Sequence, residues 1–137
     1  IYGSEPEAEH VIKKILDHFQ AGKEESGAFR FSGKEVTQLD DFSIKVTVKD
    51  NTEKIKPASH DNTRKLISKC TDEDASQMRS AVHAMAWIAR QTRPDLSQRN
   101  PRLQTLIGKG TVKDLRECNR VLEHAGKHSD TGISFSS

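Results

Sequence analysis

The sequence has few of the residues that define small secreted or membrane proteins. Its 137 residues include two cysteines, one tryptophan and one tyrosine. No apolar run reaches the length of about 18 residues that a membrane span needs. Glu5, Glu7 and Glu9 stand where a signal peptide would be basic, and two cysteines in unlike contexts make no disulfide framework. The sequence therefore predicts an intracellular protein that is neither secreted nor membrane-bound. Because its first residue is Ile1 rather than Met, we expect a fragment or a processed product.

The charge is small overall but unevenly distributed. The formal net charge is +2. Residues 1–78 hold 12 Lys and Arg against 15 Asp and Glu, whereas residues 79–137 hold 10 against 5. A basic C-terminal half is compatible with a polyanionic partner, although the bias is too modest to prove one.

The first half of the chain changes from a helical to a strand pattern. From Ala8 to Phe19, apolar residues recur at three- and four-residue spacing, which predicts an amphipathic helix over about residues 5–21. From Phe29 onward, apolar and polar residues alternate, most strictly over residues 42–48. A short acidic turn joins the two alternating runs, so they predict an antiparallel hairpin over 28–48 with one buried face.

A polar stretch around Pro57 separates this region from one with helical patterns. Thr71 and Asp74 have the spacing of a capping box, with Asp in place of Glu. The helix that they begin must end near Thr92, because Pro94 disfavours helical geometry at the preceding residue.

The end of the chain predicts shorter elements. Asn100-Pro101 predicts a kink or two short helices, since a proline inside a helix is costly. A last helix is predicted from Thr111 to about Ala125, where Gly126 would end it. Residues 132–135 predict the start of a strand whose partners lie beyond the chain. The pattern as a whole predicts an α+β fold: a lobe of one helix and an antiparallel hairpin, followed by an all-helical lobe.

Two groups of residues suggest metal or catalytic chemistry. Asp40 and Asp41 are paired as in two-metal sites, but no earlier strand supplies a further carboxylate. Asp is also a favoured turn residue, and we interpret the pair as a turn. His124 and His128 could share a helix face with Cys118, yet no Cys-x-x-Cys pair completes a site. We predict neither a metal site nor a catalytic residue, and we expect Cys118 to be a small buried residue.

The second half offers a basic surface. The eight cations concerned are Arg90, Arg93, Arg99, Arg102, Lys113, Arg116, Arg120 and Lys127. The last four project within an arc of about 60° on the last helix, and such a stripe can track a nucleic-acid backbone. Taken alone, the pattern favours an ordinary solvated face, because Lys113–Glu117 and Glu123–Lys127 are helix-stabilising pairs. Aromatic residues are scarce here, which argues against recognition of single strands.

Several motifs, taken in order, resemble one family. Ala81–Ser97, centred on Trp-Ile-Ala-Arg-Gln-Thr-Arg-Pro-Asp-Leu-Ser, resembles a distinctive segment of copia-type retrotransposon reverse transcriptases. Further similarities are Tyr2-Gly3, Phe29–Val36, Leu103-Gln104, and Thr111–Leu115 with Asn119. Together they cover nearly the whole chain. Asn100-Pro101 departs from the family, whose members usually continue a helix there.

The resemblance implies a place in a larger polymerase. Residues 1–56 would finish the palm, and residues 57–137 would form a thumb-like helical region and the connection toward a ribonuclease H domain. The catalytic aspartates, which would bind Mg²⁺ in the parent RNA-directed DNA polymerase, are expected before Ile1. This chain alone would hold no cofactor and polymerise nothing. Its localisation would be a cytoplasmic particle or the nucleus of the host.

The resemblance also implies partners and sites. The eight cations would contact template–primer nucleic acid, an RNA–DNA hybrid, and Phe31, Gly33 and Lys34 would lie near the primer end. The remainder of the Pol polyprotein would be a second partner. Two alternatives stay open: a non-catalytic helical protein-interaction module, and an inactive retroelement remnant with no stable fold. Arg93 and Asp95 could equally brace the junction between two helices.

Overall fold

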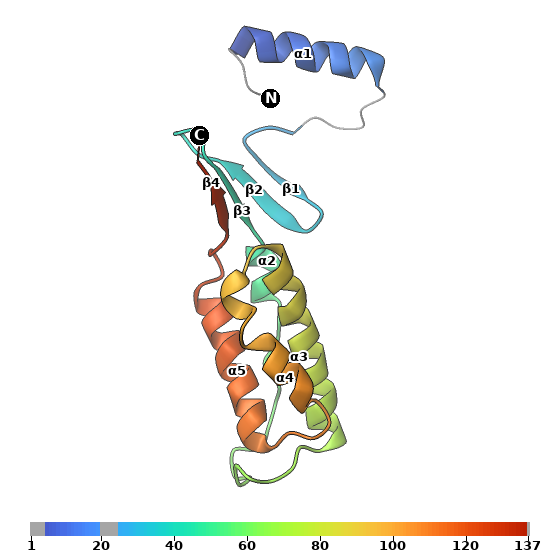
Figure 1. Cartoon of the computed structure of the whole chain (residues 1–137), viewed down its shortest axis with the longest axis vertical. Coiled ribbons are helices and arrows are strands. Elements are labelled where there is room, and N and C mark those ends of the chain that lie inside the picture. The colour runs from blue at the N-terminus through green and yellow to red at the C-terminus, as the bar shows by residue number, and fades with distance from the viewer. Residues whose placement is uncertain (1–4, 20–24, 137) are drawn as a thin grey trace.

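The computed structural model describes residues 5–19 and 25–136, and its elements form an α+β fold. A four-stranded antiparallel sheet lies between an N-terminal helix at one end of the elongated molecule and a group of helices at the other (Figure 1). The predicted fold class is confirmed. Tyr2-Gly3 lies outside the described residues.

The N-terminal helix α1 spans Glu5–His18, and Phe19 still bonds through its N–H to the Ile15 carbonyl oxygen at 2.8 Å. The helix is therefore confirmed, while the end predicted near residue 21 falls outside the described residues. Its apolar stripe is exposed: Ile15 is 44% and Phe19 63% accessible. No described side chain of α1 is buried.

The sheet is a meander of β1 Ala28–Phe31, β2 Lys34–Gln38, β3 Ile44–Thr47 and β4 Ile133–Phe135. The predicted hairpin is thus three strands rather than two, and the buried face predicted for it is wrong, because no residue of these three strands is buried. The tight turn between β1 and β2 places Ser32 (φ 50°) and Gly33 (φ 78°) in left-handed backbone, which suits the right-handed twist of a hairpin. The acidic segment forms the predicted turn between β2 and β3.

The last strand corrects one prediction. We expected the partners of 132–135 beyond the chain, but β4 pairs with β3, with Val46 opposite Ile133 and Ile44 opposite Phe135. Gly132 allows this approach, because a Cβ there would clash with the Val46 carbonyl oxygen. The sequence pattern that predicts a strand is local. Which strand it pairs with depends on where the helices between them place the chain.

The short helix α2 (Lys49–Glu53) leads from the sheet to the helical part. Helix α3 spans Asp72–Gln91, and its predicted capping box is confirmed by bonds from Asp74 N–H to Thr71 Oγ1 (3.1 Å) and from Thr71 N–H to Asp74 Oδ2 (2.7 Å). The helix ends at Thr92, as predicted from Pro94.

The remaining helices are the 3-10 helix η1 (Pro94–Leu96), α4 (Asn100–Leu106) and α5 (Val112–Lys127). Pro101 lies in the first turn of α4, where it costs no backbone bond, so the predicted break into two short pieces is confirmed. The predicted end of α5 is wrong, because the helix continues through Gly126. The N–H of His128 still bonds to the His124 carbonyl at 3.2 Å.

The core lies between α3, α4, α5 and η1. Val82, Met85, Leu115 and Cys118 are all fully buried. Burial raises the pKa of the Cys118 thiol to about 11, so the prediction of a small buried residue is confirmed. Val48, which follows β3, also joins this core, so the sheet and the helices meet there.

Candidate nucleic-acid interface

Arg93 is the one predicted contact residue that the structure removes from the surface. It is 0% accessible, and its Nε and Nη2 donate to the two carboxylate oxygens of Asp95, each at 2.9 Å. Its Nη1 donates to the carbonyl oxygens of Ala125 (3.1 Å) and His128 (2.9 Å). Arg93 therefore satisfies carbonyls at the end of α5, and the prediction that it contacts nucleic acid is wrong.

This contact also explains the electrostatics of the junction. The guanidinium of Arg93 lowers the pKa of Asp95 by hydrogen bonding, against the effect of partial burial. Asp95 in turn keeps a charge opposite the buried guanidinium, as a buried cation requires. The bracing role considered from the sequence is the one that the geometry supports.

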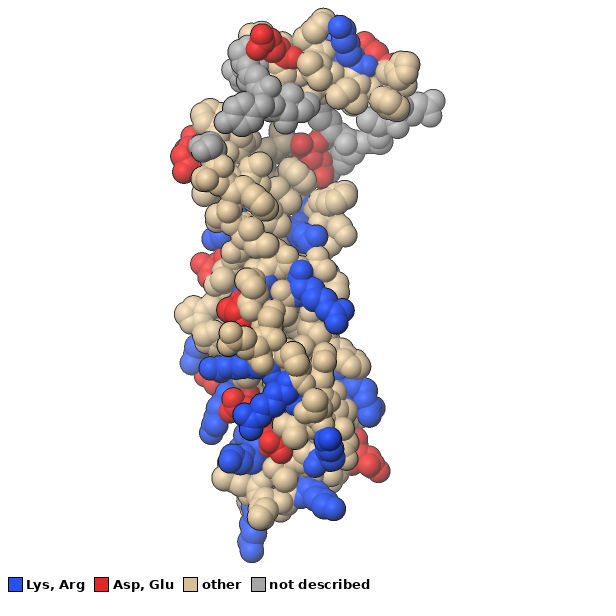
Figure 2. Space-filling view, viewed as in Figure 1, with Lys and Arg blue, Asp and Glu red and all other residues tan. Residues whose placement is uncertain are grey.

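Four of the predicted cations meet in one place. A groove of about 510 Å³ between α4 and α5 is lined by Arg99, Arg102, Lys113 and Arg120. Its floor is apolar, formed by Leu103, Leu106 and Val121, and two carboxylates, Asp114 and Glu117, also line it. We call this surface the α4–α5 groove. Figure 2 shows Lys and Arg side chains gathered over the helical part.

Both carboxylates of the groove are already engaged. Asp114 accepts from the N–H and the hydroxyl of Thr111, each at 2.8 Å, at the start of α5. Glu117 lies 3.3 Å from Arg120 in an exposed ion pair. Among the residues that the structure describes, Arg99, Arg102 and Lys113 form no ion pair. The groove therefore keeps an excess of positive charge.

The other predicted cations lie apart from the groove. Arg116 is half-buried and donates to His60 Nε2 and to the Asn62 carbonyl, both at 3.2 Å, so it holds the segment before α3. Lys127 forms an exposed ion pair with Glu123 at 2.7 Å. Arg90 is exposed beside a smaller hollow between α3 and α4.

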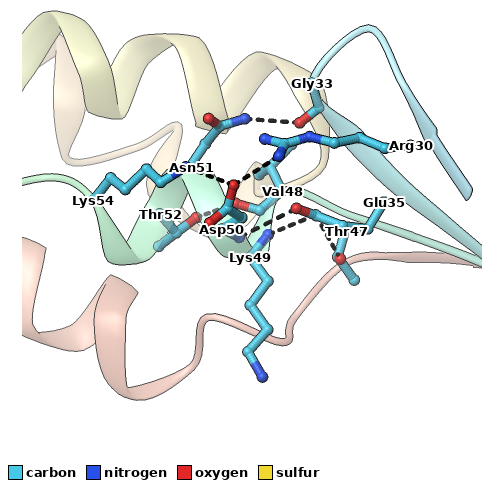
Figure 3. Close-up of polar contacts among 10 residues, drawn as sticks. All are labelled: Arg30, Gly33, Glu35, Thr47, Val48, Lys49, Asp50, Asn51, Thr52 and Lys54. Atoms are coloured by element: carbon cyan, nitrogen blue, oxygen red, sulfur yellow. Dashed lines mark hydrogen bonds and ion pairs between the residues drawn. The ribbon is translucent and has the colours of Figure 1, made fainter.

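The residues predicted near a primer end lie on the turn between β1 and β2. Phe31 is 70% accessible, whereas Gly33 and Lys34 are half-buried. The Gly33 carbonyl accepts from Asn51 Nδ2 at 2.7 Å, and a Cβ at Gly33 would lie 3.3 Å from the Trp87 ring (Figure 3 shows the Asn51 bond). The turn is thus fixed against α2 and α3.

Next to this turn, two carboxylates organise the start of α2 (Figure 3). Glu35 accepts from the N–H of Lys49 (2.9 Å) and from the hydroxyl of Thr47 (3.1 Å). Asp50 lies 2.7 Å from Lys54 and 2.8 Å from Arg30. The bond from Lys54, followed by that from Arg30, lowers the Asp50 pKa.

Sequence reasoning missed one contact, which joins the segment after α2 to helix α5. The side chain of Asn119 accepts from the Ala58 N–H at 2.9 Å and donates to the Ala58 carbonyl at 2.8 Å. One amide therefore satisfies both backbone groups of a residue far away in the sequence. Asn119 belongs to one of the motifs that resemble the family, but nothing in the sequence marked Ala58 as its partner.

Asp40 and Asp41 do not fit a two-metal site. Asp41 accepts from the N–H (3.0 Å) and the hydroxyl (2.6 Å) of Ser43, which lowers its pKa and braces the turn. Within residues 5–19 and 25–136, no three His, Cys, Asp or Glu side chains gather as metal ligands. None of the helices described there is long and apolar enough to cross a membrane.

Comparison with known proteins adds no relative. No protein-family model, curated protein or solved structure matches the chain.

Proposed function

We propose that this chain is part of an RNA-directed DNA polymerase of the copia type and contributes to binding of the primer–template, an RNA–DNA hybrid. The α4–α5 groove carries the proposal, because it gathers four predicted cations over two carboxylates that are already engaged. The assignment to the copia type rests on the sequence motifs that resemble this family and occur in the same order. In this proposal the chain binds and positions nucleic acid, and the Mg²⁺-binding aspartates belong to the rest of the parent polymerase.

The chemistry of the groove suits a phosphate backbone. Arg99, Arg102 and Lys113 have no described anionic partner, so a phosphate would meet them without first displacing an ion pair. Each phosphate that they neutralise releases counterions, which makes binding depend steeply on salt. The groove offers cations and aliphatic side chains but no aromatic ring, so it is suited to a backbone rather than to stacked bases.

The test is fluorescence anisotropy of a labelled RNA–DNA hybrid titrated with the full 137-residue chain at several salt concentrations. Replacing Arg99, Arg102 and Lys113 together by Gln should weaken binding and reduce the slope of log K against log salt by roughly one for each phosphate that is no longer neutralised. A matched control replaces Lys13, Lys14 and Lys56, which lie away from the groove, and should change little. An unaltered affinity in the groove variant, or no binding at low salt by folded protein, would contradict the proposal.

A second function is favoured by a different observation. One face of the sheet carries seven apolar residues, and none of them is buried; they are Phe29, Phe31, Val36, Ile44, Val46, Ile133 and Phe135. Together with the exposed stripe of α1, this face fits contact with another protein surface, which we assign to the remainder of the Pol polyprotein inside the cell. A change of Ile15 to Asp should abolish such contact and leave hybrid binding intact.

A further inference from the structure

The only tryptophan of the sequence lies at the edge of a second hollow, separate from the α4–α5 groove. Trp87 is 39% accessible, although the residue after it, Ile88, is buried. A space of about 400 Å³ is lined by Gly33, Asn51, Ile55, Ala84, Trp87 and Ile88. We call it the Trp87 shelf. Its lining residues come from the β1–β2 turn, from α2 and its end, and from α3. Figure 1 shows this turn close to the sheet-side end of α3.

The shelf is held in shape by its neighbours. Asn51 donates to the Gly33 carbonyl at 2.7 Å and so fixes the turn beside the indole. At Gly33, φ is 78°, and a Cβ would stand 3.3 Å from the ring, so a larger residue would be strained and would crowd the ring. The ring is therefore supported along one edge by backbone, while more than a third of the residue stays open.

Positive charge lies beside this apolar surface. Figure 3 shows the Arg30 guanidinium paired with Asp50, the residue directly before Asn51. Arg30 and Lys54 share one carboxylate, Asp50, while the neighbouring Glu35 accepts from the backbone N–H groups of Lys49 and Asp50. An accessible aromatic ring with one cation close to its hollow matches the two parts of a nucleotide, base and phosphate.

We infer that the Trp87 shelf binds one unpaired base at the end of a nucleic-acid strand, by stacking on the indole, with Arg30 near the adjoining phosphate. This inference rests on the proposed nucleic-acid binding and adds a second contact to it. The shelf holds a single aromatic ring, so it accommodates one base rather than a run of bases. It therefore agrees with the scarcity of aromatic residues in this half of the chain.

Because Trp87 is the only tryptophan, its emission reports on this site alone. The experiment titrates the full chain with three RNA–DNA hybrids: one with a short single-stranded end, one blunt, and one whose end carries abasic nucleotides. Stacking should quench the emission strongly with the first hybrid and little with the other two. Anisotropy of the same labelled hybrids reports total binding.

Variants separate stacking from folding. Replacing Trp87 by Ala should weaken binding of the single-stranded end by about 5- to 100-fold, while Phe should retain most of the affinity. Phe42→Ala, at a 72% accessible aromatic residue on another turn, is the matched control and should change nothing. Circular dichroism checks that each variant is folded. The emission titration of the unaltered chain tests stacking even if a variant does not fold.

The outcomes distinguish the two proposals. Salt-dependent anisotropy with unchanged emission, and with full affinity in the Trp87 variants, overturns the shelf and leaves the α4–α5 groove in place. The absence of any hybrid binding overturns both. Emission that changes only when another part of the polyprotein is added, and not with nucleic acid, assigns the shelf to a protein contact and also overturns the inference.

Discussion

The helical part and the sheet of this molecule use similar apolar residues with opposite results. In the helical part, Met85, Leu115 and Val121 are at most 1% accessible. On the sheet and α1, Phe31, Phe135 and Phe19 are 70%, 55% and 63% accessible. Burial of apolar area is the main favourable contribution to folding. The helical part is therefore where most of the stability of this chain resides, whereas the sheet and α1 leave large apolar side chains exposed.

The largest expected effect comes from Arg93. Replacing it by Ala leaves a cavity at a fully buried position and leaves the Ala125 carbonyl without its donor, and together these should cost about 3–5 kcal/mol. The His128 carbonyl keeps the N–H of Thr131, and Asp95 is partly exposed, so these two groups add less. Urea denaturation followed by circular dichroism measures the loss. Arg90→Ala, on the exposed surface of α3, should change the free energy of unfolding by less than about 0.5 kcal/mol. Equal effects of the two changes would contradict the role of Arg93.

The second prediction tests the contrast between the two regions directly. Leu115→Ala should lower the free energy of unfolding by about 2–5 kcal/mol, because it opens a cavity at a fully buried position. Phe31→Ala, although it removes a larger side chain, should cost less than about 1 kcal/mol. A large loss at Phe31 would show that the sheet face is covered within the chain.

The third prediction concerns the joining of β4 to β3. Gly132→Ala brings a Cβ against the Val46 carbonyl, and such overpacking costs about 1–3 kcal/mol. The loss should fall mainly on the β3–β4 pairing, so hydrogen exchange at Ile133 and Phe135 should accelerate while the amides of α3 stay protected. Gly126→Ala is the matched control, since a Cβ there meets nothing within 4 Å. Uniform acceleration over the whole chain would contradict this.

The smallest expected effect is a pH dependence in the helical part. Burial raises the pKa of Asp74, but bonds from Arg64 and Thr71 outweigh it and leave the pKa below the ordinary value of 3.8. A carboxylate whose pKa is lower in the folded state stabilises the fold above its unfolded pKa, and this stability is lost as pH falls through the folded value. Asp74→Asn should cost about 1–2 kcal/mol at pH 7.

The Asp74→Asn variant also tests how much this carboxylate contributes to acid unfolding. Thermal unfolding between pH 6 and pH 2 should show a shallower acid dependence for Asp74→Asn than for the unaltered chain. Asp72→Asn, at an exposed position in the same first turn, should keep the original acid slope. Identical slopes in the unaltered chain and Asp74→Asn would mean that other carboxylates account for acid unfolding.

Much of the helical part was predictable because its signals are local. The pair Thr71 and Asp74, Pro94 and Asn100-Pro101 each fix a boundary within a few residues of themselves, and the structure has those boundaries. Long-range partners were not predictable. Nothing in the sequence around Arg93 indicates that it contacts the end of α5. The strand pattern at 133–135 likewise does not identify β3 as its pairing partner.

The candidate site was also predictable where its signals are local and unpredictable where its contacts are long-range. Helical spacing alone placed Lys113 and Arg120 on one face, and both line the α4–α5 groove. It could not show that Arg116 is engaged by His60 and Asn62, because those residues belong to a segment without regular structure. The position of Trp87 beside Gly33 depends on how the β1–β2 turn packs on α3, which no spacing rule supplies.

The pairing of β4 with β3 has a consequence for the order of folding. Strands β1 to β3 are neighbours in sequence and close through short turns, whereas β4 reaches β3 only after all the helices between them have been placed. Contacts between residues distant in sequence form late, since loop-closure entropy opposes them until intervening structure has formed. During synthesis, the β3 edge would stay open until residues 133–135 had been made and had paired with it, and its unpaired backbone would until then be open to aggregation.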